Sequence, residues 1–250
     1  MLYPSLLLTA LFGAGALAAP AAVAQDHAQL AERGLDVNKF IDSILHYFPG
    51  SMAVNSACGL IGDGEKFIGG SFGISDTSNS NGCADVTLIF TRGTCDPGNV
   101  GILVGPPFFQ ALAGAIGSKS LNVQGVPYPA SVDGYLNADT AAGQTMAQIV
   151  RSTRASCPNT KIVLSGYSQG GMSVHNAADA LGGDMSNVSA AVIFGDPYSH
   201  KAVANIDPSK VKIVCHAGDN ICEQGALILP QHLTYAVDAA SSAAFVASHI

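Results

Sequence analysis

The sequence predicts an α/β protein built as a three-layer sandwich, with a central, mostly parallel five-stranded sheet covered by helices on both faces. Three observations predict this fold. From residue 85 onward, short runs rich in β-branched residues alternate with longer segments of helical spacing. The chain has 250 residues, of which 48% are hydrophobic and 12% charged, so it can bury one sizeable core. Strands that alternate with helices of this length form right-handed βαβ units, whose strands are parallel.

Each strand and helix is assigned from its own apolar pattern. The predicted strands are residues 85–91, 121–123, 161–165, 190–194 and 211–215. The predicted helices are residues 106–117, 138–156, 169–181 and 238–248. Residues 125–136 are rich in Gly, Pro and Tyr and are expected to form a loop. In such a sheet, functional sites form in the loops beyond the carboxyl ends of the strands.

The chain before the first strand has two parts. Residues 1–24 are predicted to be a signal peptide, because the first 25 residues carry no charged side chain and a short apolar run fades into small residues. An uncleaved anchor or an apolar N-terminal helix is the alternative. Residues 25–57 are an N-terminal extension, interpreted as a propeptide, a strut or a lid, with an amphipathic helix over residues 36–48. Residues 58–250 are expected to form a single domain.

Charge and cysteine content limit the partners and the compartment. The formal net charge is −7 and no cluster of Lys or Arg is present, so neither nucleic acid nor an anionic membrane surface is an expected partner. No later segment resembles a transmembrane helix. The even number of cysteines, six, indicates an oxidising compartment and therefore secretion. No C-x-x-C pair indicates zinc, so no metal is expected. Asn187 begins one N-glycosylation acceptor sequence.

A candidate nucleophile lies between the third predicted strand and the helix after it. Residues 166–170 read Gly-Tyr-Ser-Gln-Gly and match the pattern G-x-S-x-G, with Ser168 at its centre. The flanking glycines allow the tight turn that lifts the serine hydroxyl out beyond the strand. The N-terminus of the following helix points free N–H groups at the place where an oxyanion would form. The pattern is weak by itself, and a glycine-rich turn with an incidental serine is the alternative. The strand–turn–helix setting favours the nucleophile.

A triad on this fold needs an acid and then a histidine after the serine, in that chain order. His232, in a loop before the last predicted helix, is the expected base. The remaining histidines are disfavoured by chain order, by a helical or terminal position, or by the lack of a suitable acid before them: His27, His46, His175, His200, His216 and His249. Asp219 is the expected acid because it follows the fifth predicted strand. Asp196, after the fourth strand, is its rival.

Together these motifs resemble the fungal cutinase family. The matching segments are the elbow at 166–170, the Cys-x-x-Gly-Asp-x-x-Cys loop at 215–222, and residues 230–235, 90–94 and 97–101. The resemblance runs from about residue 81 to the C-terminus. It implies an α/β-hydrolase fold and a serine esterase with Ser168 as nucleophile, Asp219 as acid and His232 as base. It further implies an oxyanion hole formed by the N–H of Gln169 and by the N–H and hydroxyl of Thr94, where the family usually has serine.

The resemblance also implies how the cysteines pair. From the residues alone, only Cys215–Cys222 is favoured, because its short separation closes a small loop around Asp219. The cutinase pattern implies Cys83–Cys157 and Cys215–Cys222, and with these two a third bridge, Cys58–Cys95. A cysteine next to the Thr94 position departs from the family pattern. The third bridge would tie the N-terminal extension beside the oxyanion loop.

An apolar segment between acid and base is the expected substrate rim. It contains Leu227, Ile228 and Leu229, and Tyr128 is expected to face it across the site. Ordinary loop packing is the alternative. The expected function is a secreted esterase that cleaves cutin-like polyesters and short to medium acyl esters through an acyl-enzyme. It needs no cofactor, acts on an insoluble polyester or lipid ester, is not an integral membrane protein and is expected to be a monomer. An acetylxylan esterase on the same fold and a non-catalytic secreted binding protein are the alternatives.

Overall fold

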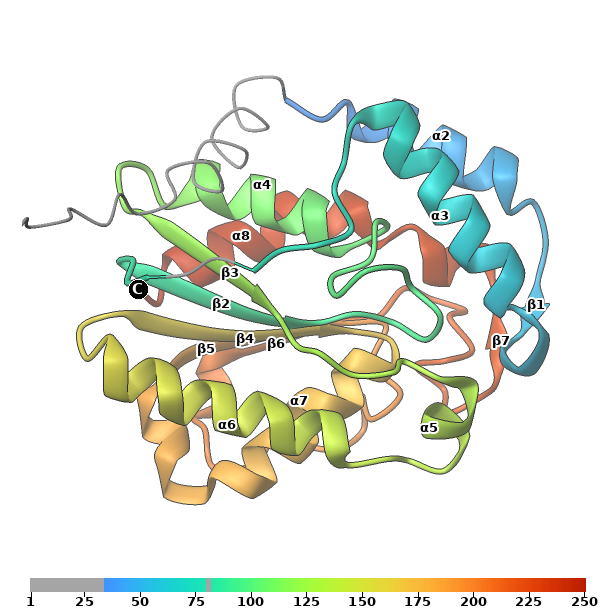
Figure 1. Cartoon of the computed structure of the whole chain (residues 1–250). Coiled ribbons are helices and arrows are strands. Elements are labelled where there is room, and N and C mark those ends of the chain that lie inside the picture. The colour runs from blue at the N-terminus through green and yellow to red at the C-terminus, as the bar shows by residue number, and fades with distance from the viewer. Residues whose placement is uncertain (1–33, 80–81) are drawn as a thin grey trace, which may run out of the picture.

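The computed structural model describes residues 34–79 and 82–250, so the predicted signal peptide and the start of the extension lie outside the described residues. The five strands of the main sheet are parallel and lie in the order β3-β2-β4-β5-β6 (Figure 1). They are β2 (Val86–Thr91), β3 (Leu121–Gly125), β4 (Lys161–Tyr167), β5 (Val188–Phe194) and β6 (Val211–Val214). The predicted fold class and its five-stranded parallel sheet are confirmed.

Helices cover both faces of this sheet and create two cores. Helices α4 (Gly105–Ala115) and α8 (Ala239–Ala247) lie on one face, and α6 (Ala141–Ser156) and α7 (Gln169–Leu181) lie on the other (Figure 1). Successive side chains of a strand point to opposite faces. In β2, Leu88 and Phe90 therefore belong to the core that includes residues of α4 and α8, whereas Ile89 belongs to the core that includes residues of α6 and α7.

The chain before β2 forms a cover at the end of the sheet where β2 and β4 finish (Figure 1). It consists of α2 (Val37–Tyr47), β1 (Met52–Ala53) and α3 (Cys58–Phe72), and is called the cover below. Helix α2 begins at Asp36, whose side chain accepts a hydrogen bond from the Lys39 N–H. The buried faces of α2 and α3 join the same core as Phe90. The cover is therefore packed onto the domain rather than resting on its surface.

Two long-range connections fix the cover. Strand β1 pairs antiparallel with β7 (Leu227–Ile228), with Met52 opposite Ile228 and Ala53 opposite Leu227. The disulfide Cys58–Cys95 joins the first residue of α3 to the loop after β2. The other two disulfides are Cys83–Cys157 and Cys215–Cys222. These are the three bridges that the resemblance implies.

The structure departs from the predicted elements in several places. The segment expected to be a loop at residues 125–136 contains a short helix, α5 (Val132–Leu136), capped by the Ser131 side chain, and α6 begins at residue 141 rather than 138. The apolar segment between acid and base contains strand β7. Helix α3 has no predicted counterpart and begins where the single domain was expected to start. Five short 3-10 helices lie among the described residues: Val54–Ser56, Gly182–Asn187, Pro208–Lys210, Pro230–Leu233 and Tyr235–Asp238.

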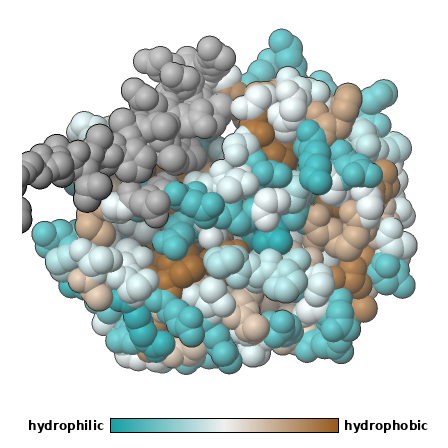
Figure 2. All heavy atoms as spheres, in the orientation of Figure 1, coloured by the Kyte–Doolittle hydropathy of each residue, from teal (hydrophilic) through white to brown (hydrophobic). Residues whose placement is uncertain are grey.

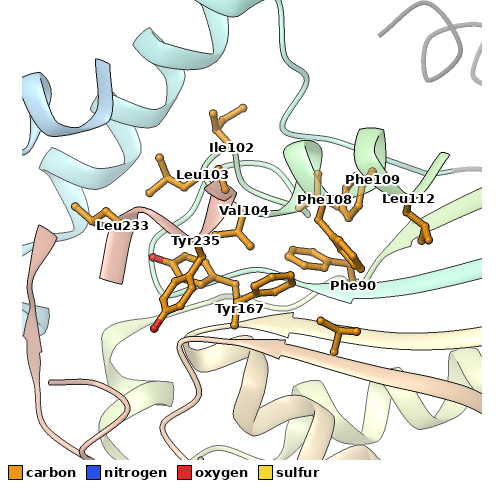
Figure 3. Close-up of a cluster of buried hydrophobic side chains, with 14 of the residues drawn as sticks. Phe90, Ile102, Leu103, Val104, Phe108, Phe109, Leu112, Tyr167, Leu233 and Tyr235 are labelled. Atoms are coloured by element: carbon orange, nitrogen blue, oxygen red, sulfur yellow. The ribbon is translucent and has the colours of Figure 1, made fainter. Parts of the chain in front are cut away.

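The core beneath α4 extends to the end of the sheet that carries the predicted site. Figure 3 shows the aromatic residues Phe90, Phe108 and Phe109 on one side of this cluster and Tyr167 and Tyr235 on the other. Phe90 and Phe109 pack edge to face, with ring centroids 5.1 Å apart. The two tyrosines are buried with their hydroxyl groups inside the protein, so each hydroxyl requires a hydrogen-bond partner there. Across residues 34–79 and 82–250, no helix has both the length and the apolar character needed to cross a membrane.

Candidate active site

The loop after β4 holds Ser168 in a backbone conformation that few residues adopt. Its φ is +56° and its ψ is −122°, as expected of a strained strand-to-helix elbow. Close packing explains the flanking glycines: a Cβ atom on Gly166 would lie 2.2 Å from the Gly170 carbonyl oxygen, and one on Gly170 would lie 2.1 Å from the Thr91 carbonyl oxygen. The Ser168 N–H donates to the Phe194 carbonyl at 2.9 Å, which ties the elbow to β5.

His232 and Asp219 lie within hydrogen-bond distance of one another. The Nδ1 atom of His232 is 2.8 Å from the Oδ2 atom of Asp219, and both side chains are buried. A carboxylate can only accept, so Nδ1 carries the proton and Nε2 is left as an acceptor. The Nε2 atom is buried and has no hydrogen-bond partner among the described residues. The ring is thus held in the tautomer that a general base requires.

Asp219 is held by several donors besides His232. Its Oδ2 atom accepts the Tyr235 hydroxyl at 2.5 Å, and its Oδ1 atom accepts the Ile221 N–H at 3.0 Å. Burial raises the pKa of the Asp219 carboxyl, but the hydrogen bonds and charge of His232, with the Tyr235 and Ile221 hydrogen bonds, outweigh it and lower that pKa below its ordinary value. Asp219 is therefore ionised when it faces His232.

Tyr167, the residue before the serine, supports the imidazole from a second side. Its ring stacks on His232 with centroids 5.1 Å apart and planes inclined by 28°. Its hydroxyl donates to the His232 carbonyl oxygen at 2.9 Å. Burial raises the pKa of the Tyr167 hydroxyl well above its ordinary value, so this group stays protonated and remains a donor. The His232 ring is therefore restrained in orientation as well as in tautomer.

The two predicted oxyanion residues meet because their strands are neighbours. Strands β2 and β4 pair in parallel up to Thr91 opposite Gly166, so the loops that follow them emerge side by side at the point where strand order reverses. The Thr94 hydroxyl donates to the Gln169 side-chain oxygen at 3.0 Å. Gln169 is the first residue of α7, and the N–H groups of the first helical turn have no partner within the helix.

The rival acid Asp196 has a different partner. Its Oδ2 atom lies 2.9 Å from His175 Nε2, and both side chains have no solvent exposure. Its Oδ1 atom accepts the Tyr198 N–H at 2.9 Å. His175 is on α7, as predicted, and belongs to a buried pair separate from Asp219 and His232. The structure therefore brings Asp219, and not Asp196, to His232.

The space beside Ser168 is small. One cavity is lined by residues of the elbow, the oxyanion loop, the histidine segment and the cover: Val54, Ile61, Thr94, Asp96, Leu103, Tyr167, Ser168, Ile228, His232 and Leu233. Its free volume is about 10 Å³, space for about one water molecule. Ser168 is only 7% exposed. Val54 and Ile61, which come from the chain before β2, therefore border the space beside Ser168.

Comparison with known proteins identifies the family. A family model described as Cutinase matches residues 82–250. The chain belongs to the cutinase family. It is 51% identical over 241 residues to a cutinase of Trichoderma harzianum, an alignment that covers 96% of each protein. Family membership makes this chain a carboxylic ester hydrolase, as the resemblance implied.

Two solved structures extend the comparison. Trichoderma reesei cutinase in complex with a C11Y4 phosphonate inhibitor is 50% identical, with a TM-score of 0.74, and the match covers 89% of this chain and 97% of that one. An acetylxylan esterase is 25% identical with a TM-score of 0.53, covering 67% of this chain and 99% of the other. The match to the cutinase structure covers more of this chain than residues 82–250, so it extends into the segment before the family model begins.

In this member of the cutinase family, only one of the four predicted substrate-binding residues lines the cavity beside Ser168. Ile228 lines the cavity beside Ser168. Leu227, its neighbour on β7, is 46% exposed, and Leu229 is not among the residues that line that cavity. Tyr128 packs against Arg92 instead: its hydroxyl donates to the Arg92 carbonyl at 2.5 Å, and the guanidinium lies over its ring. Tyr128 therefore supports the loop that carries Thr94.

Several residues that shape this cutinase site were missed in the sequence. Tyr235 and Tyr167 lie inside the motifs that carry the resemblance. The roles of their hydroxyl groups could not be predicted, because they depend on which hydrogen-bond acceptors lie nearby in the folded protein. Asp96 is two residues after Thr94 and lines the cavity. Glu65 of α3 is fully buried near Asp96. The local sequence does not single out Glu65, because the same glycine-rich segment, Gly62–Gly70, also contains Asp63 and Lys66.

Proposed function

We propose that this chain is a secreted serine esterase in which Ser168 is the nucleophile, His232 the general base and Asp219 the acid that orients it. The observation that carries the proposal is the state of His232. Its Nδ1 atom is bound by Asp219, while its Nε2 atom is buried and unpaired and belongs to a residue that lines the same cavity as Ser168. A buried acceptor without a donor is costly, and the Ser168 hydroxyl is the donor that this site offers.

In the proposed reaction, the Ser168 proton passes to His232 Nε2 while the Ser168 oxygen attacks the ester carbonyl carbon. The charge that develops on the carbonyl oxygen is stabilised by the N–H groups of Gln169 and Thr94, with the Thr94 hydroxyl beside them. His232 then gives its proton to the leaving alcohol. Water, deprotonated by His232, cleaves the resulting acyl-enzyme, releases the acid and restores Ser168. The charge of Asp219 stabilises the protonated imidazole in both steps.

The substrate we propose is an insoluble polyester or lipid ester of the cutin type. Large apolar side chains are exposed on three elements at one end of the molecule (Figure 1): Leu227 on β7, Leu136 on α5, and Leu60 and Phe67 on α3, of which Phe67 is 65% exposed. Figure 2 shows hydrophobic residues gathered at the end of the molecule where α3 lies. A surface of this kind favours contact with an apolar solid over contact with a soluble sugar ester.

The cover is proposed to be a lid rather than a propeptide or a strut. Val54 and Ile61 of the cover segment line the cavity, which leaves no room for an acyl chain beside Ser168. Opening requires separation of β1 from β7 and of the α3 face from the core. Because the cover is part of the apolar core, its opened face exposes hydrophobic side chains, which an apolar substrate can contact.

The compartment and the assembly follow from the same features. Three disulfides support an oxidising compartment, and we propose that the enzyme acts outside the cell. All residues proposed to act in the site come from one chain, so we propose a monomer. One sedimentation run tests this, and a dimer as the active form would contradict it.

The substrate proposal is tested with a panel of insoluble cutin, acetylated xylan and a soluble short-chain ester. The wild type is expected to release fatty acids from cutin and to cleave the soluble ester, and Ser168→Ala is expected to do neither. Ser152→Ala, on the exposed side of α6, is the matched control and should behave as the wild type. Preferential release of acetate from xylan would replace the cutinase assignment with acetylxylan esterase. Full activity of Ser168→Ala would overturn the mechanism.

The apolar rim is tested with Leu227→Ser. This change is expected to lower hydrolysis of the insoluble polyester by more than that of the soluble ester, because only the solid must be contacted by the rim. Val237→Ser removes another exposed apolar side chain, 52% exposed, and should leave the ratio of the two activities unchanged. Equal losses on both substrates for Leu227→Ser would contradict a role in surface contact.

The lid is tested by weakening its packing. Ile68→Val removes one methylene from the buried face of α3 and is expected to cost about 1 kcal/mol, which raises the population of an open cover about fivefold. The rate at which a small phosphonate reacts with Ser168 should rise by the same factor. Ile162→Val makes the same change in the core on the other face of the sheet and should not alter that rate. Equal rates for the two variants would contradict the lid.

A further inference from the structure

A buried carboxyl group links the cover to the oxyanion loop. Glu65 lies on the inner face of α3 with no solvent exposure. Its Oε2 atom accepts the Ile102 N–H at 2.7 Å. Its Oε1 atom is buried and has no hydrogen-bond donor among the described residues. An ionised carboxylate in this position would leave an oxygen uncompensated in an apolar environment, which is strongly unfavourable.

The group that faces Glu65 is a second carboxyl, that of Asp96. The two carboxyl groups influence each other's pKa through their charges and through a hydrogen-bond interaction, and a hydrogen bond between two carboxyl groups requires one proton. Asp96 is the better anion of the two, because its Oδ2 atom accepts the Gly93 N–H at 2.8 Å and Arg92 lies beside it. Burial, together with the charge of Asp96 and the hydrogen bond to it, raises the pKa of Glu65 well above its ordinary value of 4.5. Glu65 therefore holds the proton.

The other titratable or charged groups around the pair come from four segments of the chain. Arg92 belongs to the loop after β2, Tyr167 to the end of β4 and His232 to the segment before α8, and each interacts electrostatically with Asp96. Besides burial, the charge of Asp96 also contributes to raising the pKa of Tyr128, which lies in the loop after β3. The single positive charge of Arg92 can balance the charge of one carboxylate in this cluster. It cannot balance both Glu65 and Asp96 if the two are ionised together.

The position of Asp96 links this pair to catalysis. Asp96 follows Thr94 by two residues, lines the cavity with Ser168 and His232, and holds the Gly93 N–H on the other side of Thr94. Its carboxylate is tightly enclosed, since a Cβ atom on Gly101 would lie 2.7 Å from its Oδ2 atom. Movement of the Asp96 side chain therefore moves the turn from Gly93 to Asp96, which carries the proposed oxyanion donor.

We propose that Glu65 is a positioning residue for the oxyanion loop: its protonated carboxyl donates a hydrogen bond to the Asp96 carboxylate and so fixes Thr94 while the cover is closed. The inference rests on the proposed role of Thr94 in the esterase reaction. Loss of the Glu65 proton at alkaline pH places two negative charges in contact, which displaces the turn and weakens the cover. Activity therefore declines at alkaline pH for a reason that His232 does not supply.

The test compares Glu65→Gln with Glu65→Ala on a soluble short-chain ester from neutral to alkaline pH. Glutamine accepts from the Ile102 N–H, donates to Asp96 and does not titrate. Its kcat is expected to stay within about threefold of the wild type at neutral pH and to persist at alkaline pH where the wild-type kcat falls. Glu65→Ala is expected to lower kcat about 10- to 100-fold, with a much smaller change in KM. Glu223→Gln, an exposed position, should follow the wild-type profile.

Two results would overturn the proposal: the same alkaline decline in Glu65→Gln as in the wild type, or wild-type kcat in Glu65→Ala. A measurement without catalysis separates this inference from the proposed function. In a Ser168→Ala background, infrared spectra at neutral pH should contain a protonated carboxyl C=O band that Glu65→Gln removes. A spectrum without that band would refute the protonated Glu65. Esterase activity in Ser168→Ala would refute the proposed nucleophile and leave the infrared result on Glu65 valid.

Discussion

The Tyr235 hydroxyl lies 2.5 Å from Oδ2 of Asp219, the same oxygen that accepts the hydrogen bond of His232. The hydroxyl in turn accepts a hydrogen bond from the backbone N–H of His216 at 3.0 Å, so its own proton is directed to the carboxylate. The His216 ring stacks on Tyr235 with centroids 4.1 Å apart. The proposed catalytic acid is therefore oriented by a tyrosine that is itself fixed on two sides.

Tyr235→Phe removes this donor and is expected to cost about 2 kcal/mol of unfolding free energy, as for a buried hydrogen bond to a charged group. The pKa of the Asp219 carboxyl is lower in the folded protein than its ordinary value of 3.8. The ionised carboxylate therefore stabilises the folded state above pH 3.8, and this stabilisation is lost as the pH falls through the folded-state pKa of Asp219. The variant raises the folded-state pKa of Asp219. The difference in Tm between wild type and variant should therefore shrink as pH falls below 3.8.

Thermal unfolding over acid and neutral pH measures this effect. Tyr198→Phe, at a half-buried tyrosine that packs on His175 rather than on Asp219, is the control and should show a difference from wild type that does not depend on pH. A Tyr235→Phe difference that stays constant from neutral to acid pH would show that its hydroxyl does not act through Asp219.

Asp219→Asn and Asp196→Asn distinguish the two His–Asp pairs. Asp219→Asn is expected to lower kcat about 10⁴-fold, because the amide favours the wrong imidazole tautomer. Asp196→Asn alters the pair with His175 and is expected to cost about 1–3 kcal/mol of stability while kcat stays within about tenfold of the wild type. Steady-state kinetics and denaturant unfolding of both variants provide the measurement. A larger loss of kcat in Asp196→Asn would transfer the role of acid to that residue.

The closeness of the elbow to β2 gives a prediction for Gly170. In Gly170→Ala, the new methyl group would lie 2.1 Å from the Thr91 carbonyl oxygen, so backbone must shift and a loss of about 3 kcal/mol or more is expected. Gly114→Ala, in helix α4, meets nothing within 4 Å and should raise stability by about 0.5–1 kcal/mol. Urea unfolding compares them. Similar stability of the two variants would mean that the elbow does not pack as described.

The disulfide of the cover gives a further prediction. Cys58→Ser with Cys95→Ser opens a bridge between residues 37 apart and is expected to cost about 4 kcal/mol. It should also speed the reaction of a small phosphonate with Ser168, because one of the two ties on the cover is lost. Cys83→Ser with Cys157→Ser, a bridge away from the cover, should lose similar stability without a change in that rate. A slower or unchanged rate in the first variant would contradict the tether.

Much of this architecture is predictable from sequence because its signals are local. The strands of the sheet are short apolar runs, and α7 directly follows the G-x-S-x-G motif. The strands and α7 are therefore predicted with only small errors at their ends. Helix α3 was missed because five of its 15 residues are glycine, and glycine disfavours helices. Its stability comes from burial of residues such as Ile61 and Ile68 against the domain, which only the tertiary structure supplies.

The site divides in the same way. Ser168, Asp219 and His232 are predicted from motif spacing and chain order, which are properties of the sequence, and the structure places Asp219 against His232. The pairing of β1 with β7 was not found, because two-residue strands have no periodicity and their contact joins residues 52–53 to residues 227–228. Glu65 was not found because its meaning depends on Asp96, which is brought to it by the fold. Tyr128 is predicted to face the substrate, but in the structure its hydroxyl donates a hydrogen bond to the Arg92 carbonyl oxygen.

The assignment of Ser168 as the nucleophile is tested most directly by identifying the residue that reacts with a phosphonate ester in the purified enzyme. Peptide mapping by mass spectrometry should show one added phosphonyl group per chain, on the peptide that contains Ser168, in proportion to lost activity. Ser168→Ala should take up none. Label on another residue, or complete loss of activity without label on Ser168, would contradict the assignment of Ser168 as the nucleophile.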